Sequence, residues 1–283
     1  MSSCEYFKLL NGKSIPSIGF GTFKITDENE CKNSVINAVK LGYTHIDTAA
    51  VYGNEVPVGK GIAECGVDRK DLFVTSKVWN TERGYDKTLK ACEETLKRLN
   101  LEYLDLYLIH WPAVSFKYQN FNELNADSWK AMVKLYKDGL VKSIGVSNFT
   151  CPHLKPLLDS EVTPMVNQIE YHPGYTQTET VKLCQENGII VEAWSPLGRG
   201  KLTEAKELLD IAQKYGKSAA QICIRFCLQN KVVALVKSTH KERMAQNLNV
   251  DDFVICDEDM ATLSAIGNNL GWSGLDPEKI EFA

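Results

Sequence analysis

The chain has 283 residues, of which 44% are hydrophobic and 24% are charged, and its formal net charge is −4. This is ordinary globular composition and excludes a mainly disordered chain. The mild negative charge argues against nucleic acid or an anionic membrane surface as the main partner, because proteins that bind either one carry a basic footprint. Any anionic ligand must therefore be held by local contacts.

The nine cysteines are odd in number, scattered, and include no C-x-x-C pair. They are expected to be free thiols, and no metal site is predicted. No apolar run approaches about 18 residues, and the first residues, MSSCEYFKLL, do not have the pattern of a signal peptide. The prediction is a cytoplasmic protein that does not enter a membrane.

The predicted elements alternate along the chain. A turn at Asn11-Gly12 predicts an N-terminal β-hairpin. Eight short apolar runs follow, as expected of buried strands: Ile18–Thr22, His45–Asp47, Phe73–Lys77, Leu106–His110, Ser143–Ser147, Val166–Glu170, Ile190–Trp194 and Val233–Val236. Seven segments with helical periodicity lie between them: Asp27–Leu41, Asn54–Cys65, Asp86–Leu99, Ser128–Asp138, Pro152–Ser160, Thr178–Asn187 and Ser218–Gln229.

Eight strands alternating with helices over this length indicate a closed parallel barrel, with an open doubly wound sheet as the alternative. No Pro/Gly/Ser-rich linker divides the chain, so residues 1–283 are expected to form one domain. The fold prediction is therefore a (β/α)8 barrel with an N-terminal β-hairpin and extra C-terminal helices. In such a barrel the functional residues gather at the carboxyl ends of the strands.

Polar residues stand at or just past the ends of several predicted strands, among them Asp47, Lys77 and His110, and Tyr52 follows five residues after Asp47. A single lysine or histidine in such a place is usually a solvated strand end or a hydrogen-bonded core residue. Together, at one mouth, they suggest acid catalysis: Asp47 would hold Lys77 charged, and the ammonium would lower the pKa of Tyr52. His110 could donate a second hydrogen bond to the same substrate oxygen.

A carbonyl reduction would use this arrangement, but it needs a hydride that no side chain supplies, so a nicotinamide or flavin cofactor is implied. The usual G-x-G-x-x-G fingerprint is absent, and residues 53–61 and 145–149 fail the P-loop and G-x-S-x-G patterns. A phosphate site is instead predicted where the last strand meets a short helix. Its candidate residues are Lys237, Ser238, Thr239, Arg243, Gln246 and Asn247.

The chain closely resembles the aldo-keto reductase family over nearly its whole length. The matching segments are GFGTF (19–23), GYTHIDTAAVYGNE (42–55), LFVTSKVW (72–79), DLYLIHWP (105–112), IGVSNF (144–149), VNQIEYHP (166–173), AWSPLGRG (193–200) and KSTHKERMAQN (237–247). Within the family it looks most like compact microbial and protozoan members, such as diketogluconate reductases and prostaglandin F synthases. The resemblance implies NADPH-dependent reduction of aldehydes and ketones by a small barrel that is often a monomer.

The resemblance also assigns roles to residues. Tyr52 would be the proton donor of a tetrad completed by Asp47, Lys77 and His110. Cofactor contacts would come from Gly21, Thr22, Asp47, Ser147, Asn148, Gln168, Trp194, Ser195 and Leu197, and from Lys237, Ser238, Thr239, Arg243, Gln246 and Asn247 at the 2′-phosphate and adenine. Substrate contacts would come from Phe23, Trp79, His110, Trp111 and Trp272.

Two other functions stay open at this point. The first is a redox-sensing regulatory protein that binds the cofactor with little turnover. The second is a Schiff-base aldolase that uses Lys77 as its nucleophile, since lysines at barrel strand ends can serve that role.

Overall fold

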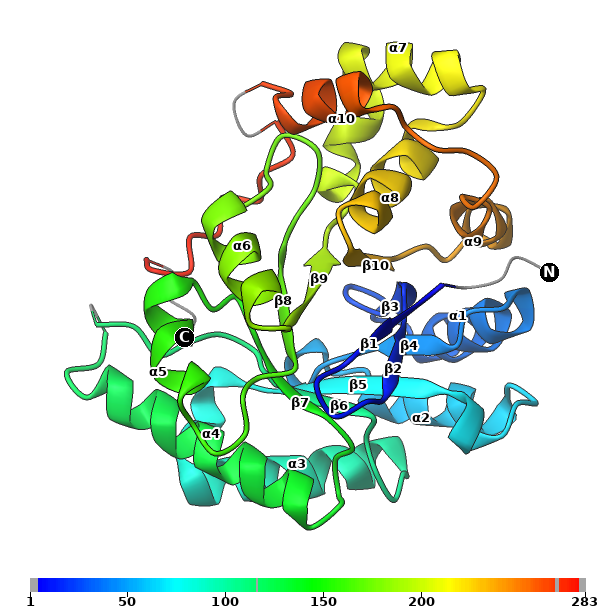
Figure 1. The fold of residues 1–283 in the computed structure, drawn as a ribbon. Helices are drawn as coiled ribbons and strands as arrows, with labels where there is room; N and C mark the ends of the chain where they lie inside the picture. Colours follow the sequence, from blue (N-terminus) through cyan, green and yellow to red (C-terminus); the bar gives the residue numbers. More distant parts are fainter. Residues whose placement is uncertain (1–4, 116, 268–269, 280–283) are drawn as a thin grey trace.

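The computed structural model describes residues 5–115, 117–267 and 270–279. Eight parallel strands close into a barrel in the order β10-β3-β4-β5-β6-β7-β8-β9 (Figure 1). They are β3 (Ile18–Gly21), β4 (His45–Asp47), β5 (Phe73–Val78), β6 (Leu106–Ile109), β7 (Ile144–Ser147), β8 (Val166–Glu170), β9 (Ile190–Trp194) and β10 (Val232–Val236). All eight predicted strands are present, and the closed ring confirms the barrel and excludes the open sheet.

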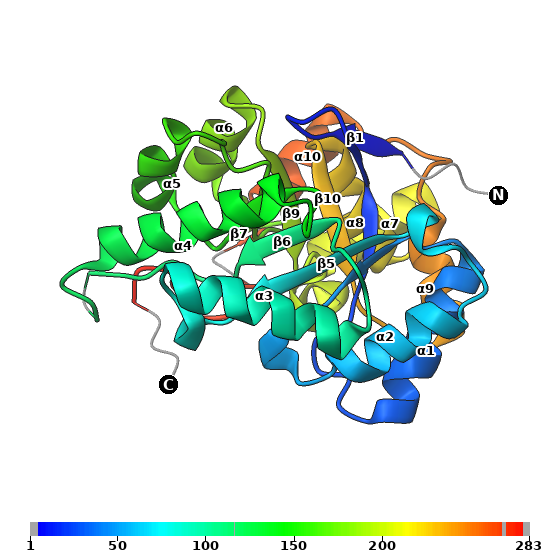
Figure 2. The ribbon, with the colours of Figure 1, turned by 90° about the horizontal axis from the view of Figure 1, so that it is seen from below.

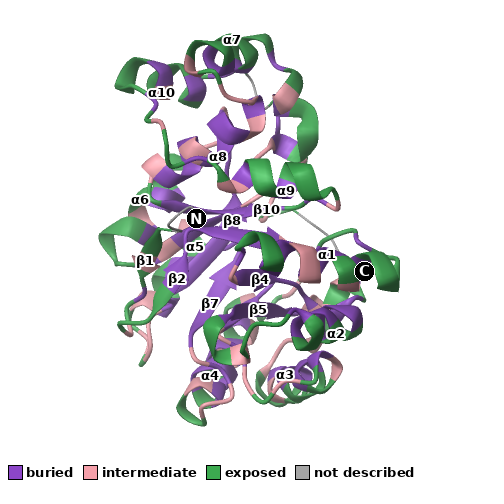
Figure 3. Cartoon of the chain, turned by 90° about the vertical axis from the view of Figure 1, so that its right-hand side faces the viewer, coloured by how far each residue is buried: buried purple, intermediate pink, exposed green. Residues whose placement is uncertain are grey.

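Helices surround the barrel and turn their polar faces outward, so that the strands are buried and the outer helix surfaces exposed (Figures 2 and 3). They are α1 (Glu28–Leu41), α2 (Glu55–Glu64), α3 (Tyr85–Leu99), α4 (Phe121–Lys137), α5 (Cys151–Leu158), α6 (Thr178–Glu186), α7 (Lys206–Tyr215), α8 (Ala219–Gln229), α9 (Lys241–Leu248) and α10 (Asp257–Ser264). Short 3-10 turns are η1 (Ala50–Tyr52), η2 (Arg69–Asp71), η3 (Asn80–Glu82) and η4 (Gly198–Glu204).

Local capping contacts mark several helix ends. The Asp27 side chain accepts a hydrogen bond from Glu30 N at 2.8 Å, and Ser218 forms a reciprocal capping box with Gln221. Gly42 ends α1 at φ 113°, a left-handed conformation that costs glycine little.

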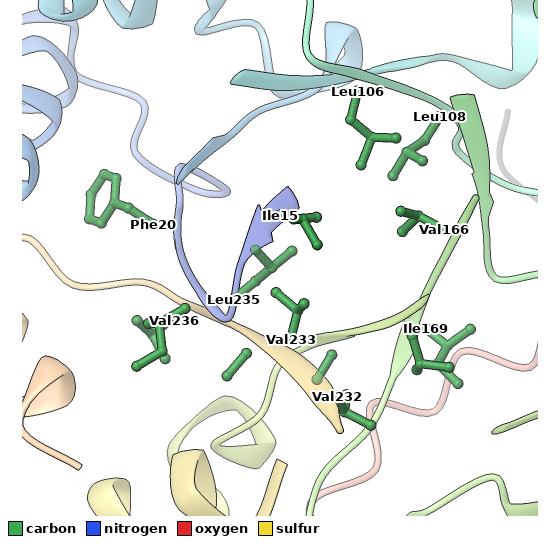
Figure 4. Packing of buried hydrophobic residues seen from close by; sticks show 14 of the residues in the cluster. Ile15, Phe20, Leu106, Leu108, Val166, Ile169, Val232, Val233, Leu235 and Val236 are labelled. Carbon is green, nitrogen blue, oxygen red and sulfur yellow. The ribbon is translucent and has the colours of Figure 1, made fainter. Parts of the chain in front are cut away.

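The N-terminal hairpin closes the amino end of the barrel. Strand β1 (Tyr6–Lys8) pairs antiparallel with β2 (Ser14–Pro16). Ile15 is fully buried and lies within the ring of core side chains from the barrel strands (Figure 4). The turn is tied to the start of β7, because Asn11 Nδ2 donates to Lys142 O at 3.0 Å. We call residues 6–16 the hairpin floor.

Two helical features differ from the sequence prediction. Helix α4 begins seven residues earlier than expected, at Phe121, because the Asn125 side chain bonds both Ala113 N (2.7 Å) and Ala113 O (3.0 Å) and so anchors a weakly helical segment. Helix α7 was not predicted. It packs beside α10, where Asp259 Oδ2 accepts from Tyr215 Oη (2.6 Å) and Lys214 Nζ (2.8 Å).

The eight cysteines in the described part of the chain are free thiols, as predicted, while Cys4 lies outside it. Across those same residues, no helix has the length and apolarity needed to cross a membrane. Nor do they contain a group of histidine, cysteine and acidic side chains that could hold a metal ion.

Candidate active site

A buried ion pair lies at the carboxyl end of β4 and β5. Lys77 Nζ is 2.7 and 2.8 Å from the two Asp47 carboxylate oxygens, and it also donates to Thr48 O at 2.9 Å. The two strands are paired with Asp47 opposite Thr75, and the side chain of Lys77, two residues farther along β5, extends to the end of β4. Burial alone would lower the pKa of Lys77, but the charges of Asp47 and Tyr52 raise it above its usual value, so the amine is an ammonium.

Tyr52 is brought to this pair by the turn that follows β4. The 3-10 turn η1 ends at Tyr52, and Gly53 leaves it at φ 68°. Asn54 then fastens the loop, because its side chain accepts from Thr48 Oγ1 at 2.9 Å and donates to Thr22 O at 2.9 Å. Tyr52 Oη consequently lies 3.4 Å from Lys77 Nζ.

His110 completes the group. Its ring packs edge-on against Tyr52, with centroids 5.8 Å apart. Burial, aided by the positive charge of Lys77, lowers the pKa of His110 well below its usual value, so the ring is neutral. His110 Nδ1 is buried and has no hydrogen-bond partner among the described residues, whereas a buried N–H without an acceptor is costly. The proton is therefore expected on Nε2, which leaves that atom as the donor.

One electrostatic prediction is wrong. The ammonium of Lys77 was expected to bring the pKa of Tyr52 below its usual value. Burial instead raises the pKa of Tyr52, Lys77 opposes the rise without cancelling it, and Asp47 adds to it. The low polarity around a partly buried phenol outweighs the nearby cation.

Four of the predicted cofactor residues, Ser147, Asn148, Gln168 and Trp194, form one hydrogen-bonded cluster. Ser147 Oγ donates to Gln168 O at 2.7 Å, and Asn148 Nδ2 donates to Ser147 Oγ at 3.0 Å. Trp194 Nε1 donates to Asn148 Oδ1 at 2.8 Å, which fixes the indole at the end of β9. The structure thus brings together residues from three strand ends.

A layer of polar side chains lies inside the barrel, beneath Tyr52 and toward the carboxyl ends of the strands. We call it the interior polar layer, and its members are His45, Asp47, Thr75, Lys77, Gln168 and Glu192. Glu192 was missed in the sequence, although an acidic residue in the centre of an otherwise apolar strand is a signal that could have found it. Burial and the charge of Asp47 raise the pKa of Glu192 to about 8.

The predicted phosphate-binding segment follows β10 as expected. Lys237 and Arg243 are exposed, and Ser238 Oγ accepts from His240 N at 3.1 Å just before α9. Thr239 is partly buried, Gln246 is exposed and Asn247 is buried on the same segment. The predicted short helix carrying Arg243, Gln246 and Asn247 is present as α9.

The loop after β9 carries Ser195 and Leu197, both partly buried, and leads into η4. Arg199, the second residue of η4, was not among the predicted contacts. Its guanidinium lies 5.7 Å from the centre of the Trp194 ring, on the exposed surface. Two strands away around the barrel, at the end of β3, Thr22 N and Oγ1 both donate to Asp47 O at 3.0 Å, and Gly21 ends β3 beside β10.

Three aromatic residues border Tyr52 and His110. Phe23 is 48% exposed and its ring lies 4.9 Å from that of Tyr52. Trp79 packs edge-on against His110 at 5.2 Å, and Trp111 lies 6.5 Å from Trp194.

Trp272, the fourth predicted substrate residue, stands apart from this group. It stacks on Tyr175 at 6.2 Å, and no ring contact between it and the tetrad is found in the described residues. Its segment is held at the end of β8, where Glu170 accepts from Ser273 N (2.8 Å) and Ser273 Oγ (2.6 Å).

Comparison with known proteins decides the family. The sequence model described as "Aldo/keto reductase family" matches residues 17–268. The chain belongs to this family. It is 48% identical to the glyoxal reductase of Bacillus subtilis over 276 residues, which cover 97% of each chain. It is 42% identical to the 9,11-endoperoxide prostaglandin H2 reductase of Trypanosoma cruzi, over 98% of this chain and 96% of the relative.

Solved structures also superpose closely on this chain. A mutant of Gox0644, solved in complex with NADPH, matches with a TM-score of 0.90 and 39% identity, covering 99% of this chain and 100% of that one. The predictions of the family, the barrel and an NADP-dependent oxidoreductase that reduces carbonyl groups are therefore confirmed. The roles of individual residues in this aldo-keto reductase remain predictions.

Proposed function

We propose that this aldo-keto reductase reduces an aldehyde or ketone with Tyr52 as the proton donor. The observation that carries the proposal is the placement of Tyr52 Oη 3.4 Å from an ammonium that is itself paired with Asp47. A proton donor must hold its proton before the reaction, and the raised pKa of Tyr52 keeps the phenol neutral. Lys77 then stabilises the phenolate that forms when the proton leaves.

His110 would orient the substrate. A neutral imidazole with its proton on Nε2 can donate one hydrogen bond to the carbonyl oxygen, beside the phenol of Tyr52. Two donors aimed at one oxygen stabilise the negative charge that develops there. The aromatic rings of Phe23, Trp79 and Trp111 would form the apolar wall around that oxygen, with Trp272 as a more distant contributor.

The residues at the mouth fit NADPH. Two exposed cations, Lys237 and Arg243, flank the start of α9, where backbone N–H groups favour a phosphate, and Arg199 adds a third beside Trp194. The partly exposed Trp194 ring would stack on the nicotinamide, and Ser147, Asn148 and Gln168 would hold its carboxamide. When bound, NADPH supplies the hydride that no side chain can supply. The remaining predicted contacts are Gly21, Thr22, Asp47, Ser195, Leu197, Ser238, Thr239, Gln246 and Asn247.

The aldolase alternative is disfavoured by the state of Lys77. A Schiff base needs a neutral amine, but Lys77 is an ammonium that bonds both oxygens of Asp47 and the carbonyl of Thr48. The Lys77 side chain is also fully buried.

Replacing Tyr52 by phenylalanine tests the proposed function. Turnover is measured with NADPH and a panel of aldehydes and ketones. The panel includes glyoxal, because a 48% identical relative is a glyoxal reductase. Tyr52→Phe should lower kcat by about 10²- to 10⁴-fold. NADPH binding, followed by fluorescence, should be retained. Tyr6→Phe, on the exposed outer strand β1, is the matched control and should keep wild-type kcat.

Two outcomes would contradict the proposal. Near-normal turnover by Tyr52→Phe would remove Tyr52 from the mechanism. Tight NADPH binding by the wild type with negligible turnover across the whole panel would favour the redox-sensing alternative instead.

We further propose that the protein works in the cytoplasm as a monomer of one domain, residues 1–283, on small molecules and not on nucleic acid. The net charge of −4 and the closed barrel, whose strands span residues 18–236, support this. Size-exclusion chromatography with light scattering tests the monomer, since a dimer would have about twice the 31.7 kDa of the chain.

A further inference from the structure

Glu192 is a buried carboxyl that the proposed mechanism does not use. It occupies the middle of β9, its side chain is fully buried, and the one lysine nearby, Lys77, is already paired with Asp47. Glu192 Oε1 has no hydrogen-bond partner among the described residues and lies 3.6 Å from His45 Nε2. A buried carboxyl without its own cation is costly, so its presence below the active site calls for a function.

A single amide joins Glu192 to the catalytic ion pair. Gln168 Nε2 donates to Glu192 Oε2 at 2.9 Å and to Asp47 Oδ2 at 3.0 Å. An amide nitrogen has two N–H donors, and here each one is taken by a carboxyl oxygen. A continuous chain of hydrogen bonds therefore runs from Glu192 through Gln168 and Asp47 to Lys77, and from there to Tyr52.

We propose that Glu192 is a positioning residue for the reduction: through Gln168 it holds Asp47 in place, and by gaining or losing a proton it sets the negative charge beneath Tyr52. This inference rests on the proposed function of Tyr52. It adds a residue that touches neither substrate nor cofactor and acts only through the hydrogen-bonded chain.

The groups that face Glu192 determine the sign of its effect. Strand β4 contributes His45 and Asp47, β5 contributes Lys77, β8 contributes the neutral Gln168, and β10 has no titratable residue. Burial lowers the pKa of His45 to about 3, so this ring is neutral and cannot compensate a second carboxylate. When Glu192 is protonated, one carboxylate faces one ammonium.

When Glu192 ionises, two carboxylates face the single ammonium of Lys77. The excess negative charge raises the proton affinity of Lys77 and, through it, that of Tyr52. A phenol that holds its proton more tightly is a weaker donor. The rate of carbonyl reduction should therefore fall as Glu192 loses its proton.

The pH profile of Glu192→Gln tests this effect. The glutamine keeps an acceptor for Gln168 but cannot ionise, so at pH 7 its kcat should lie within about threefold of wild type. Between pH 7 and pH 9 the wild-type kcat should fall about tenfold and that of Glu192→Gln about twofold or less. Asp105→Asn is the matched control. Burial also raises the pKa of Asp105, but this residue lies at the other end of the barrel. The pH profile of Asp105→Asn should match that of wild type. An alkaline fall that is the same in wild type and Glu192→Gln would overturn the proposal.

A measurement that needs no activity separates this inference from the proposed function. In protein labelled with ¹³C at the glutamate side-chain carboxyl, one resonance should titrate near pH 8 and be missing in Glu192→Gln. Asp47→Asn removes the neighbouring negative charge and should move that titration to lower pH. The same resonance is identified by its response to Asp47→Asn if Glu192→Gln does not fold.

The two proposals fail in different ways. If every glutamate carboxyl titrates near the ordinary value of about 4.3, or if Asp47→Asn moves none of them, Glu192 is not coupled to the ion pair and the inference is wrong. If the resonance behaves as expected but no carbonyl is reduced, the coupling stands and the proposed function fails.

Discussion

Each end of the barrel contains an ion pair. At the amino end, Arg69 Nη2 lies 2.7 Å from Asp105 Oδ2, and both side chains also bond the backbone: Asp105 accepts from Val74 N, and Arg69 donates to Leu72 O and Tyr103 O. This pair fastens loops and β-strand starts to one another.

At the carboxyl end, the Lys77–Asp47 pair is buried, and besides Asp47 and the carbonyl of Thr48, Lys77 contacts a side-chain hydroxyl, Tyr52 Oη. The side chains of the amino-end pair are 20% and 18% exposed, whereas the carboxyl-end pair lies in the buried interior polar layer. A lysine or arginine paired with an aspartate therefore stabilises loops where its other partners are backbone groups. The same kind of pair can assist catalysis where it also contacts a side chain that can exchange a proton.

The largest expected effect comes from removing the lysine. Lys77→Met leaves Asp47 buried without a cation, which should lower the free energy of unfolding by about 3–5 kcal/mol. It also removes the charge that stabilises the Tyr52 phenolate, so kcat should fall by about 10²- to 10⁴-fold. Urea denaturation and NADPH-linked turnover, normalised to folded protein, measure the two losses.

Arg69→Met is the matching change at the amino end. Because the Arg69 and Asp105 side chains are about one-fifth exposed, its cost in stability should be smaller, and kcat per folded molecule should stay at the wild-type value. A large fall in kcat for Arg69→Met would end the distinction between the two pairs.

Glycines offer a second way to probe the interior polar layer. A Cβ at Gly19 would lie 2.5 Å from Leu235 Cδ2 and 2.7 Å from His45 Nδ1, both inside the barrel. Gly19→Ala must push these side chains apart and should cost about 1–3 kcal/mol of stability. Two residues along the same strand, a Cβ at Gly21 would meet only Val236 O at 3.7 Å, so Gly21→Ala should change the urea midpoint little. Equal midpoints for the two variants would contradict this account.

The barrel and the tetrad could be predicted because their signals are local. A strand end is visible where an apolar run meets a polar residue, as at Asp47 and Lys77, and a closed barrel then brings separate strand ends together. The first turns of α4 were not predicted, because Asn125 is held by a contact to Ala113 that no local sequence pattern reveals.

The features of the site that were not predicted also depend on contacts between residues far apart in the sequence. Glu192 escaped because its importance depends on Gln168 and Asp47, which come from two other strands. The direction of the Tyr52 pKa shift also could not be read from neighbouring charges, because it depends on how far burial removes the phenol from water.

The dependence of stability on pH provides a third test of the polar layer. Burial, and then the charge of Lys77, lowers the pKa of His45 to about 3. The unfolded chain therefore binds a proton at His45 below about pH 6.5, where the folded chain does not. His45 contributes full stability above that pH, and the contribution is lost as the pH falls, by up to about 1.4 kcal/mol per pH unit.

The variant His45→Asn isolates this contribution. Glu192 acts in the opposite direction in part of the same range, because its raised pKa lets the folded state hold a proton that the unfolded state releases. The contribution of Glu192 is present in both proteins, so it cancels in the difference in unfolding free energy between wild type and His45→Asn. That difference should shrink as the pH is lowered from about 6.5 to about 4.5, and a constant difference would show that His45 protonates normally in the folded barrel.

The smallest expected effect concerns an arginine at each end of the barrel, the exposed Arg243 and the half-buried Arg225. Arg243 lies at the mouth on α9, whereas Arg225, on α8, lies beside Phe7 of the hairpin floor. Arg243→Ala should raise the Kd for NADPH about tenfold, or about 1.4 kcal/mol, and leave the Kd for NADH nearly unchanged, because only NADPH carries the 2′-phosphate. Arg225→Ala should change neither Kd.

Salt separates a charge effect from a change of shape at this site. Attraction between an exposed guanidinium and a phosphate is screened as ionic strength rises, so the NADPH affinities of wild type and Arg243→Ala should converge between about 0.05 M and 0.5 M salt. A deficit that persists at high salt, or one that NADH shares, would mean that Arg243 shapes α9 instead of recognising the phosphate. In that case Arg243 would resemble Arg69 of the amino-end pair, whose guanidinium bonds backbone carbonyls.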